Sequence, residues 1–122
     1  MAWLQRHVPA GAHVTVFDNT SGEAVIALMG PQSRELLNRV SPDGFTNDVH
    51  PFGTAREIEI GMGLARAHRI SYVGELGWEL HVPSHSALDV YQAVYKNCEA
   101  VSQQHAAPFS SFTHEPVHVP CG

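Results

Sequence analysis

Residues 69–83 read RISYVGELGWELHVP, and this stretch decides the fold. Residues 70–73 and 78–82 are rich in β-branched and aromatic side chains, which favour strands. Between them, Gly74 and Gly77 supply the positive φ angles that a hairpin loop needs. The stretch therefore predicts a β-hairpin in which Tyr72 lies opposite Glu79.

Opposed side chains in such a hairpin share one face of the sheet, with Cβ atoms about 4.5–5.5 Å apart. A tyrosine ring offers a stacking surface for a flat heterocycle, and a neighbouring carboxylate accepts hydrogen bonds from its N–H groups. The same pair is also typical of a solvated sheet face, which is the commoner case. We single out Tyr72 and Glu79 as candidate ligand-binding residues, with both interpretations open at this point.

Periodicity predicts the elements on either side of this stretch. Strands are expected at 13–17 and 56–62, where apolar residues alternate, and at 24–29, which is apolar throughout. Helices are expected from Pro31 to Val40 and from His85 to about Asn97, because apolar residues recur there at the spacing of one helix face. A glycine-containing bend is expected before Leu64.

These elements predict an α+β fold. We expect an antiparallel sheet of about five strands with both helices packed on one face, related to ferredoxin-like arrangements. Residues 1–98 would form the folded part. Residues 99–122 lack periodicity and are expected to be an irregular or disordered tail.

Composition excludes several classes of function. The chain has 122 residues, a formal net charge of −5 and only 7 Lys and Arg, so nucleic acid and anionic membranes are not expected partners. It has neither an apolar run of membrane-spanning length nor the pattern of a signal peptide. With two cysteines, we expect a cytoplasmic or mitochondrial matrix location with reduced thiols.

The sequence carries no motif that commits to metal or nucleophilic chemistry. Nine histidines invite a metal hypothesis, but the spacing of Cys98, His114, His118 and Cys121 matches no compact zinc motif. A nucleophile elbow, a Walker-type phosphate loop and a dinucleotide glycine fingerprint are also missing. We therefore predict no metal ligand and no catalytic residue.

Two motifs nevertheless resemble a known family. Residues 27–37, ALMGPQSRELL, and residues 72–83, YVGELGWELHVP, resemble the folate-binding aminomethyltransferases, which include the T-protein of the glycine cleavage system. Residues 51–58, PFGTAREI, look most similar to the branch fused behind a flavin-dependent amine oxidase, as in sarcosine and dimethylglycine dehydrogenases. The resemblance implies that the chain is the central part of such a folate-binding domain.

The resemblance also implies a ligand. By matching position in the family's motif, Tyr72 and Glu79 would line a tetrahydrofolate pocket, in which folate captures a one-carbon unit from a small amine substrate. FAD would belong to a separate domain that this chain does not contain. The family's folate-positioning aspartate and its folate-tail arginine have no counterpart here, so we expect a chain that is inactive alone.

An alternative from another class remains open. Relatives of this family include a regulatory subunit that keeps the fold without the transferase reaction, so a noncatalytic regulatory or protein-interaction module is the second hypothesis. Either way, sheet edges left without neighbours tend to pair with other chains, and homo-oligomers through those edges are expected.

Overall fold

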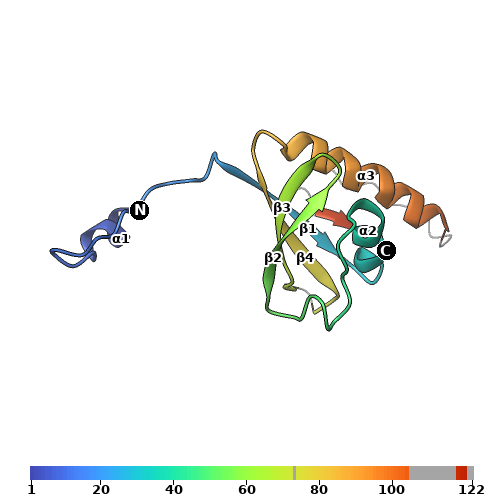
Figure 1. The fold of residues 1–122 in the computed structure, drawn as a ribbon, viewed down its shortest axis with the longest axis horizontal. Coiled ribbons are helices and arrows are strands. Elements are labelled where there is room, and N and C mark those ends of the chain that lie inside the picture. The colour runs from blue at the N-terminus through green and yellow to red at the C-terminus, as the bar shows by residue number, and fades with distance from the viewer. Residues whose placement is uncertain (73, 105–117, 121–122) are drawn as a thin grey trace.

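The computed structural model describes residues 1–72, 74–104 and 118–120 (Figure 1). These residues form three helices and five strands. In chain order they are α1 Ala2–Arg6, β1 Glu23–Met29, α2 Ser33–Val40, β2 Ala55–Ile60, β3 Gly63–His68, β4 Gly77–Pro83, α3 Ala87–Gln104 and β5 His118–Pro120. The fold is α+β, as the sequence predicts.

One sheet with strand order β2-β3-β4-β1-β5 organises the molecule. The pairs β2–β3, β3–β4 and β4–β1 are antiparallel, whereas β5 runs parallel to β1 along three residues. Four of the five strands therefore form an antiparallel sheet as expected, and the fifth strand, β5, differs because it is parallel to its neighbour. Because β1 pairs with β4 over seven residues, it forms the longest ladder and holds the two halves of the chain together.

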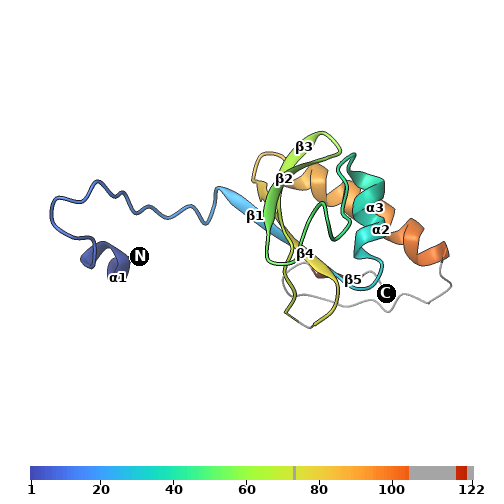
Figure 2. The same cartoon turned by 60° about the horizontal axis from the view of Figure 1, so that its bottom comes forward.

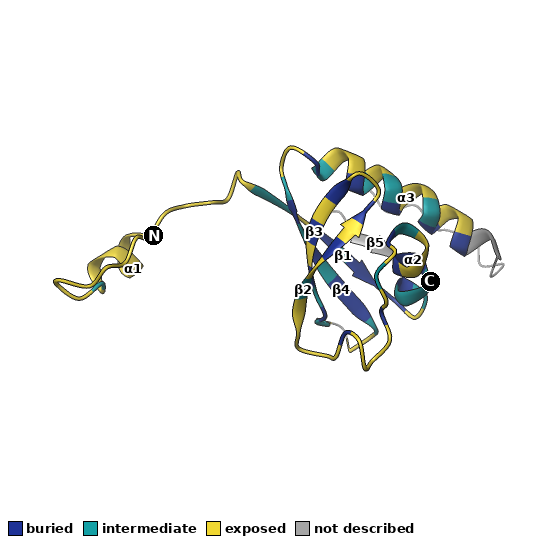
Figure 3. Cartoon of the chain, in the orientation of Figure 1, coloured by how far each residue is buried: buried dark blue, intermediate teal, exposed yellow. Residues whose placement is uncertain are grey.

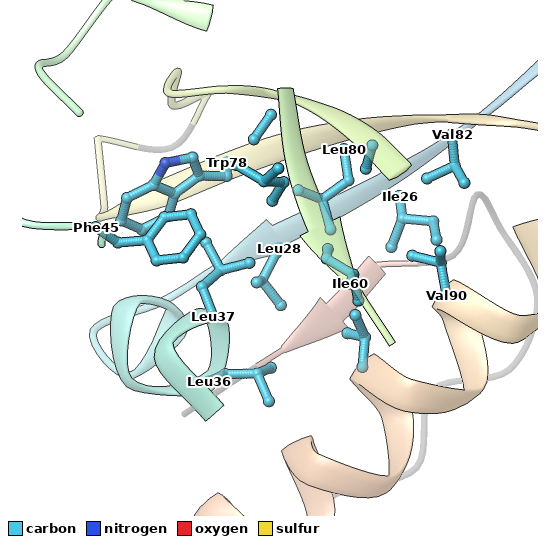
Figure 4. Close-up of a cluster of buried hydrophobic side chains, with 14 of the residues drawn as sticks. Ile26, Leu28, Leu36, Leu37, Phe45, Ile60, Trp78, Leu80, Val82 and Val90 are labelled. Carbon is cyan, nitrogen blue, oxygen red and sulfur yellow. The ribbon is translucent and has the colours of Figure 1, made fainter. Parts of the chain in front are cut away.

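The core lies between the sheet and the two longer helices (Figure 4). Along β4, Trp78, Leu80 and Val82 are fully buried and alternate with residues on the opposite face. They share one hydrophobic cluster with Leu36 and Leu37 of α2 and with valines of α3. Because both helices join the same cluster, they pack on one face of the sheet, as expected.

The predicted hairpin of residues 70–73 with 78–82 is wrong. The partner of β4 on that side is β3, and Glu79 lies opposite His68 rather than Tyr72. Strand β3 alternates buried small residues with exposed ones, so Ala65 and Ala67 gave little hydrophobic signal in the sequence. The bend expected before Leu64 is instead the tight turn of the β2–β3 hairpin, with Gly61 at φ +58°.

The expected strand at 13–17 is also wrong. These residues have no regular secondary structure, and Val14 and Phe17 are exposed. Together with α1, which has no buried residue, they form an arm that extends away from the sheet in both views (Figures 1 and 2). The alternation of apolar residues predicts a strand only where a neighbouring strand is available to pair with it.

The last helix is longer than the sequence indicates. Helix α3 ends at Gln104, beyond the predicted end near Asn97, with Cys98 and Val101 buried in the core. The expected irregular tail is therefore wrong at 99–104, which continue α3, and at His118–Pro120, which form β5. Residues 105–117 and 121–122 of that tail lie outside the described residues. Within the described helices, none is long and apolar enough to cross a membrane.

Candidate functional site

Glu79 projects from the face of the sheet that the helices leave open. The face is fixed by the alternation along β4, since Trp78 and Leu80 on either side are fully buried in the core cluster (Figure 4). Figure 3 shows that β4 carries buried and half-buried positions along its length. The neighbours of Glu79 in the register are Ala27 on β1 and His68 on β3. Its side chain is only 17% exposed, which places a carboxylate in a partly desolvated position.

A network of charged and imidazole groups surrounds that carboxylate. The Nε2 atom of His81 lies 3.6 Å from Glu79 Oε2, and its Nδ1 atom lies 3.7 Å from Glu23 Oε2. Arg66 pairs with Glu23 at 3.1 Å, and its Nε donates to Nε2 of His68. Burial, together with the nearby His81 and Arg66, lowers the pKa of His68. The site therefore holds a carboxylate within a fixed polar frame.

A shallow depression opens on the same face. It has a volume of about 370 Å³ and is lined by residues of the four strands β1 to β4, namely Glu23, Glu57, Leu64, Ala65, Arg66, His81 and Pro83. The depression is open to solvent and lies over the ion pairs of Arg66 and His81. It supplies space for a ligand group beside the charged network.

Tyr72 lies apart from the strands, in the connection formed by residues 69–76. Its side chain is 81% exposed, and the register does not make it a cross-strand neighbour of Glu79. The structure therefore does not bring the two predicted residues together as a pair. Tyr72 instead presents a free aromatic ring on a loop near the start of β4.

This loop is tied down at both ends. At its start, Arg69 Nη1 donates to the carbonyl of His50 at 2.7 Å. At its end, the Leu76 carbonyl accepts hydrogen bonds from the Gly30 amide at 2.8 Å and from Ser33 Oγ at 3.2 Å. These bonds connect the loop to the start of α2 and to the connection before β2, so Tyr72 stands on an anchored segment.

A buried aromatic corner supports the base of the loop. Trp78 Nε1 donates to His50 Nδ1 at 3.3 Å, and the Trp78 ring meets Phe45 edge-on at 5.9 Å between centroids. The guanidinium of Arg69 lies 5.4 Å from the indole centroid. Burial, and then the charge of Arg34, lowers the pKa of Arg69. Since Arg69 donates to the carbonyl of His50, it joins the start of its own loop to the connection before β2, and this corner has a structural role.

Sequence reasoning missed the neighbours of Glu79. His81 follows Glu79 by two residues on a predicted strand, so the alternation alone places both side chains on one face. The sequence therefore indicates that His81 lies beside Glu79, although the prediction of the site did not include His81. The positions of Glu23, Arg66 and His68 depend on the strand order β3-β4-β1, which the sequence did not specify.

The described residues contain no group of His, Cys, Asp and Glu arranged to hold a metal ion. Cys98 is buried in the core on α3, where it packs with apolar side chains. His114 and Cys121, the other residues weighed for a zinc site together with His118, lie outside the described residues.

Comparison with known proteins identifies the family. A family model described as the GCVT N-terminal domain matches residues 1–111. The chain belongs to this family. The resemblance found in the two motifs is thereby confirmed, and the GCVT N-terminal domain match includes β1 to α3, hence the whole open face around Glu79.

Relatives of this GCVT-domain chain include an oxidase, a dehydrogenase and an aminomethyltransferase. It is 40% identical over 95 residues to 4-methylaminobutanoate oxidase (formaldehyde-forming) of Paenarthrobacter nicotinovorans, covering 78% of this chain and 11% of that protein. It is 42% identical over 79 residues to mitochondrial sarcosine dehydrogenase of Mus musculus, covering 65% of this chain and 9% of that protein. An aminomethyltransferase of Chlorobium limicola is 34% identical over 95 residues, covering 78% of this chain and 26% of that protein. The chain thus corresponds to a segment of much longer relatives.

Proposed function

We propose that this chain is a segment of a tetrahydrofolate-dependent aminomethyl transferase whose parent is a flavin-linked dehydrogenase of the sarcosine or dimethylglycine type. The observation that carries the proposal is the partly buried carboxylate of Glu79 on the open face of the sheet. Glu79 stands at the position of the family motif that the resemblance assigns to folate. In this proposal the sheet is the central part of the folate-binding domain and is related to ferredoxin-like arrangements.

Glu79 would bind the pterin ring through its N–H groups. A carboxylate accepts such hydrogen bonds in both oxygens, and partial removal from water strengthens them. Tyr72 would contribute its exposed ring as a stacking surface, because it stands on a loop that is anchored at both ends. In this proposal the two residues contact the ligand from the sheet face and from the loop, without contacting each other.

The same proposal explains why we expect no turnover by the chain alone. The resemblance places the family's folate-positioning aspartate and folate-tail arginine outside the segment that this chain matches, so the residues of this segment alone would not hold the reacting amine of folate in line with a one-carbon donor. FAD and the amine substrate would bind elsewhere in the parent enzyme. A cytoplasmic or mitochondrial matrix location fits this role, and two sarcosine dehydrogenases among the relatives are named mitochondrial.

Isothermal titration calorimetry of the full chain with tetrahydrofolate tests the proposal. We expect Glu79→Gln to weaken binding about tenfold or more, because a hydrogen bond to a charged group contributes about 1.5–3 kcal/mol. Glu59→Gln is the matched control, since it removes an exposed carboxylate from β2 that does not line the depression. Equal affinities for the wild-type chain and Glu79→Gln would refute the assignment of Glu79.

A second pair of variants examines Tyr72. Tyr72→Ala removes the exposed ring on the loop, whereas Phe52→Ala removes an exposed aromatic ring that is 70% exposed in a different connection. We expect only Tyr72→Ala to weaken folate binding, because base stacking on an aromatic ring is lost. Absence of folate binding by a folded wild-type chain would instead favour the noncatalytic interaction module.

A further inference from the structure

We propose that His81 is a positioning residue for Glu79, holding its carboxylate in the orientation that receives the ligand. This inference rests on the proposed function of Glu79. In this proposal His81 does not contact the ligand itself. Its contacts come from residues on three neighbouring strands. His81 and Glu79 are on β4, Glu23 is on β1, and Arg66 and His68 are on β3.

The two nitrogens of the His81 ring face two different carboxylates. Nε2 lies 3.6 Å from Glu79 and Nδ1 lies 3.7 Å from Glu23, so the ring bridges them. The ring of His68 lies 4.5 Å away between centroids and limits its rotation. Arg66 fixes the far carboxylate through its 3.1 Å ion pair with Glu23. The orientation of Glu79 is therefore linked to a chain of contacts that ends on β3.

The position of His81 makes it the link between the two carboxylates. Glu23 also pairs with Arg66, whereas the contact of the Glu79 carboxylate is with Nε2 of His81. The two nitrogens lie on different sides of one imidazole ring, so a single side chain faces both carboxylates. The ring of His68 packs beside it from β3. The placement of the His81 ring therefore determines the side from which Glu79 is held.

Three substitutions at His81 separate positioning from packing. The amide nitrogen of glutamine corresponds to the Nε2 position that faces Glu79, whereas the amide nitrogen of asparagine corresponds to the Nδ1 position that faces Glu23. We expect His81→Asn and His81→Leu to weaken tetrahydrofolate binding about two- to fivefold, the range of a partly exposed ion pair, and His81→Gln to retain the wild-type affinity. Equal losses in all three variants would overturn the proposal.

A double substitution asks whether His81 acts through Glu79. In a chain that already carries Glu79→Gln, His81→Leu is expected to produce no further loss of folate affinity. An undiminished additional loss would show that His81 acts independently, which contradicts the proposal. Circular dichroism of every variant confirms that the chain is folded before affinities are compared.

A measurement without folate tests the contact itself. The ring nitrogen signals of His81 in NMR spectra are expected to move in Glu79→Gln and in Glu23→Gln, and to stay in place in the exposed control Glu59→Gln. Unchanged signals in both of the first two variants would overturn the bridge. If those signals move while the wild-type chain binds no folate, the bridge is retained and the proposed function is the part that fails.

Discussion

Replacing Trp78 by phenylalanine should destabilise the fold through one buried hydrogen bond. Trp78 is fully buried, and its Nε1 donates to Nδ1 of His50, whose side chain is also buried at 1% exposure. Phenylalanine keeps a ring against Phe45 but has no donor. His50 Nδ1 would then be a buried acceptor without a partner.

The magnitude follows from the contacts of the indole. An unsatisfied buried group costs about 1–3 kcal/mol. The guanidinium of Arg69, 5.4 Å from the indole centroid, would lose part of a cation–π interaction that contributes about 0.5–1 kcal/mol. We therefore expect Trp78→Phe to lower the free energy of unfolding by about 1–4 kcal/mol.

Urea unfolding followed by circular dichroism measures this change. The matched control is Trp3→Phe, the same substitution at a residue that is 62% exposed in α1, for which we expect a change within about 0.5 kcal/mol. In a His50→Leu background the cost of Trp78→Phe should shrink, because the acceptor is already gone. Equal effects of Trp78→Phe and Trp3→Phe would refute the reasoning.

Three further predictions concern stability. Burial, with the charges of Arg56 and Arg69, lowers the pKa of His50 below its usual 6.5. The unfolded chain then takes up a proton that the folded chain excludes, so the free energy of unfolding should fall as the pH drops below about 6.5. His50→Gln should flatten this pH profile in urea titrations at several pH values. Gly63→Ala should cost about 1–3 kcal/mol, because a Cβ there would lie 2.8 Å from a methyl of Val90, whereas Gly44→Ala meets only ordinary contacts and should be nearly neutral by the same urea assay. Ser33→Ala should cost about 1 kcal/mol and speed amide hydrogen exchange in residues 70–76, because it removes the hydroxyl that donates to the carbonyls of Gly30 and Leu76; exchange as slow as in the wild-type chain would contradict that role.

The elements with a strong local signal were predictable from the sequence. The apolar run at 24–29 became β1, and the apolar stripes of α2 and α3 pack against the sheet as their spacing indicates. The failures have a common physical cause. Strand β3 contains Gly63, Ala65 and Ala67 on its buried face, and such small side chains carry little hydrophobic pattern. Its pairing depends on tertiary neighbours, which periodicity does not encode.

The error in the hairpin register leaves Glu79 on its predicted strand but separates it from Tyr72. Burial of Trp78 and Leu80 fixes the face of β4 that is packed against the helices, and a period of two then directs Glu79 to the other face whichever strand pairs beside it. The position of Tyr72 has no such constraint, because it depended on a register that β3 replaces. A site residue on a half-buried strand is therefore predictable from its own neighbours in the sequence, whereas a residue in a loop requires the anchoring contacts made by Arg69 and Ser33.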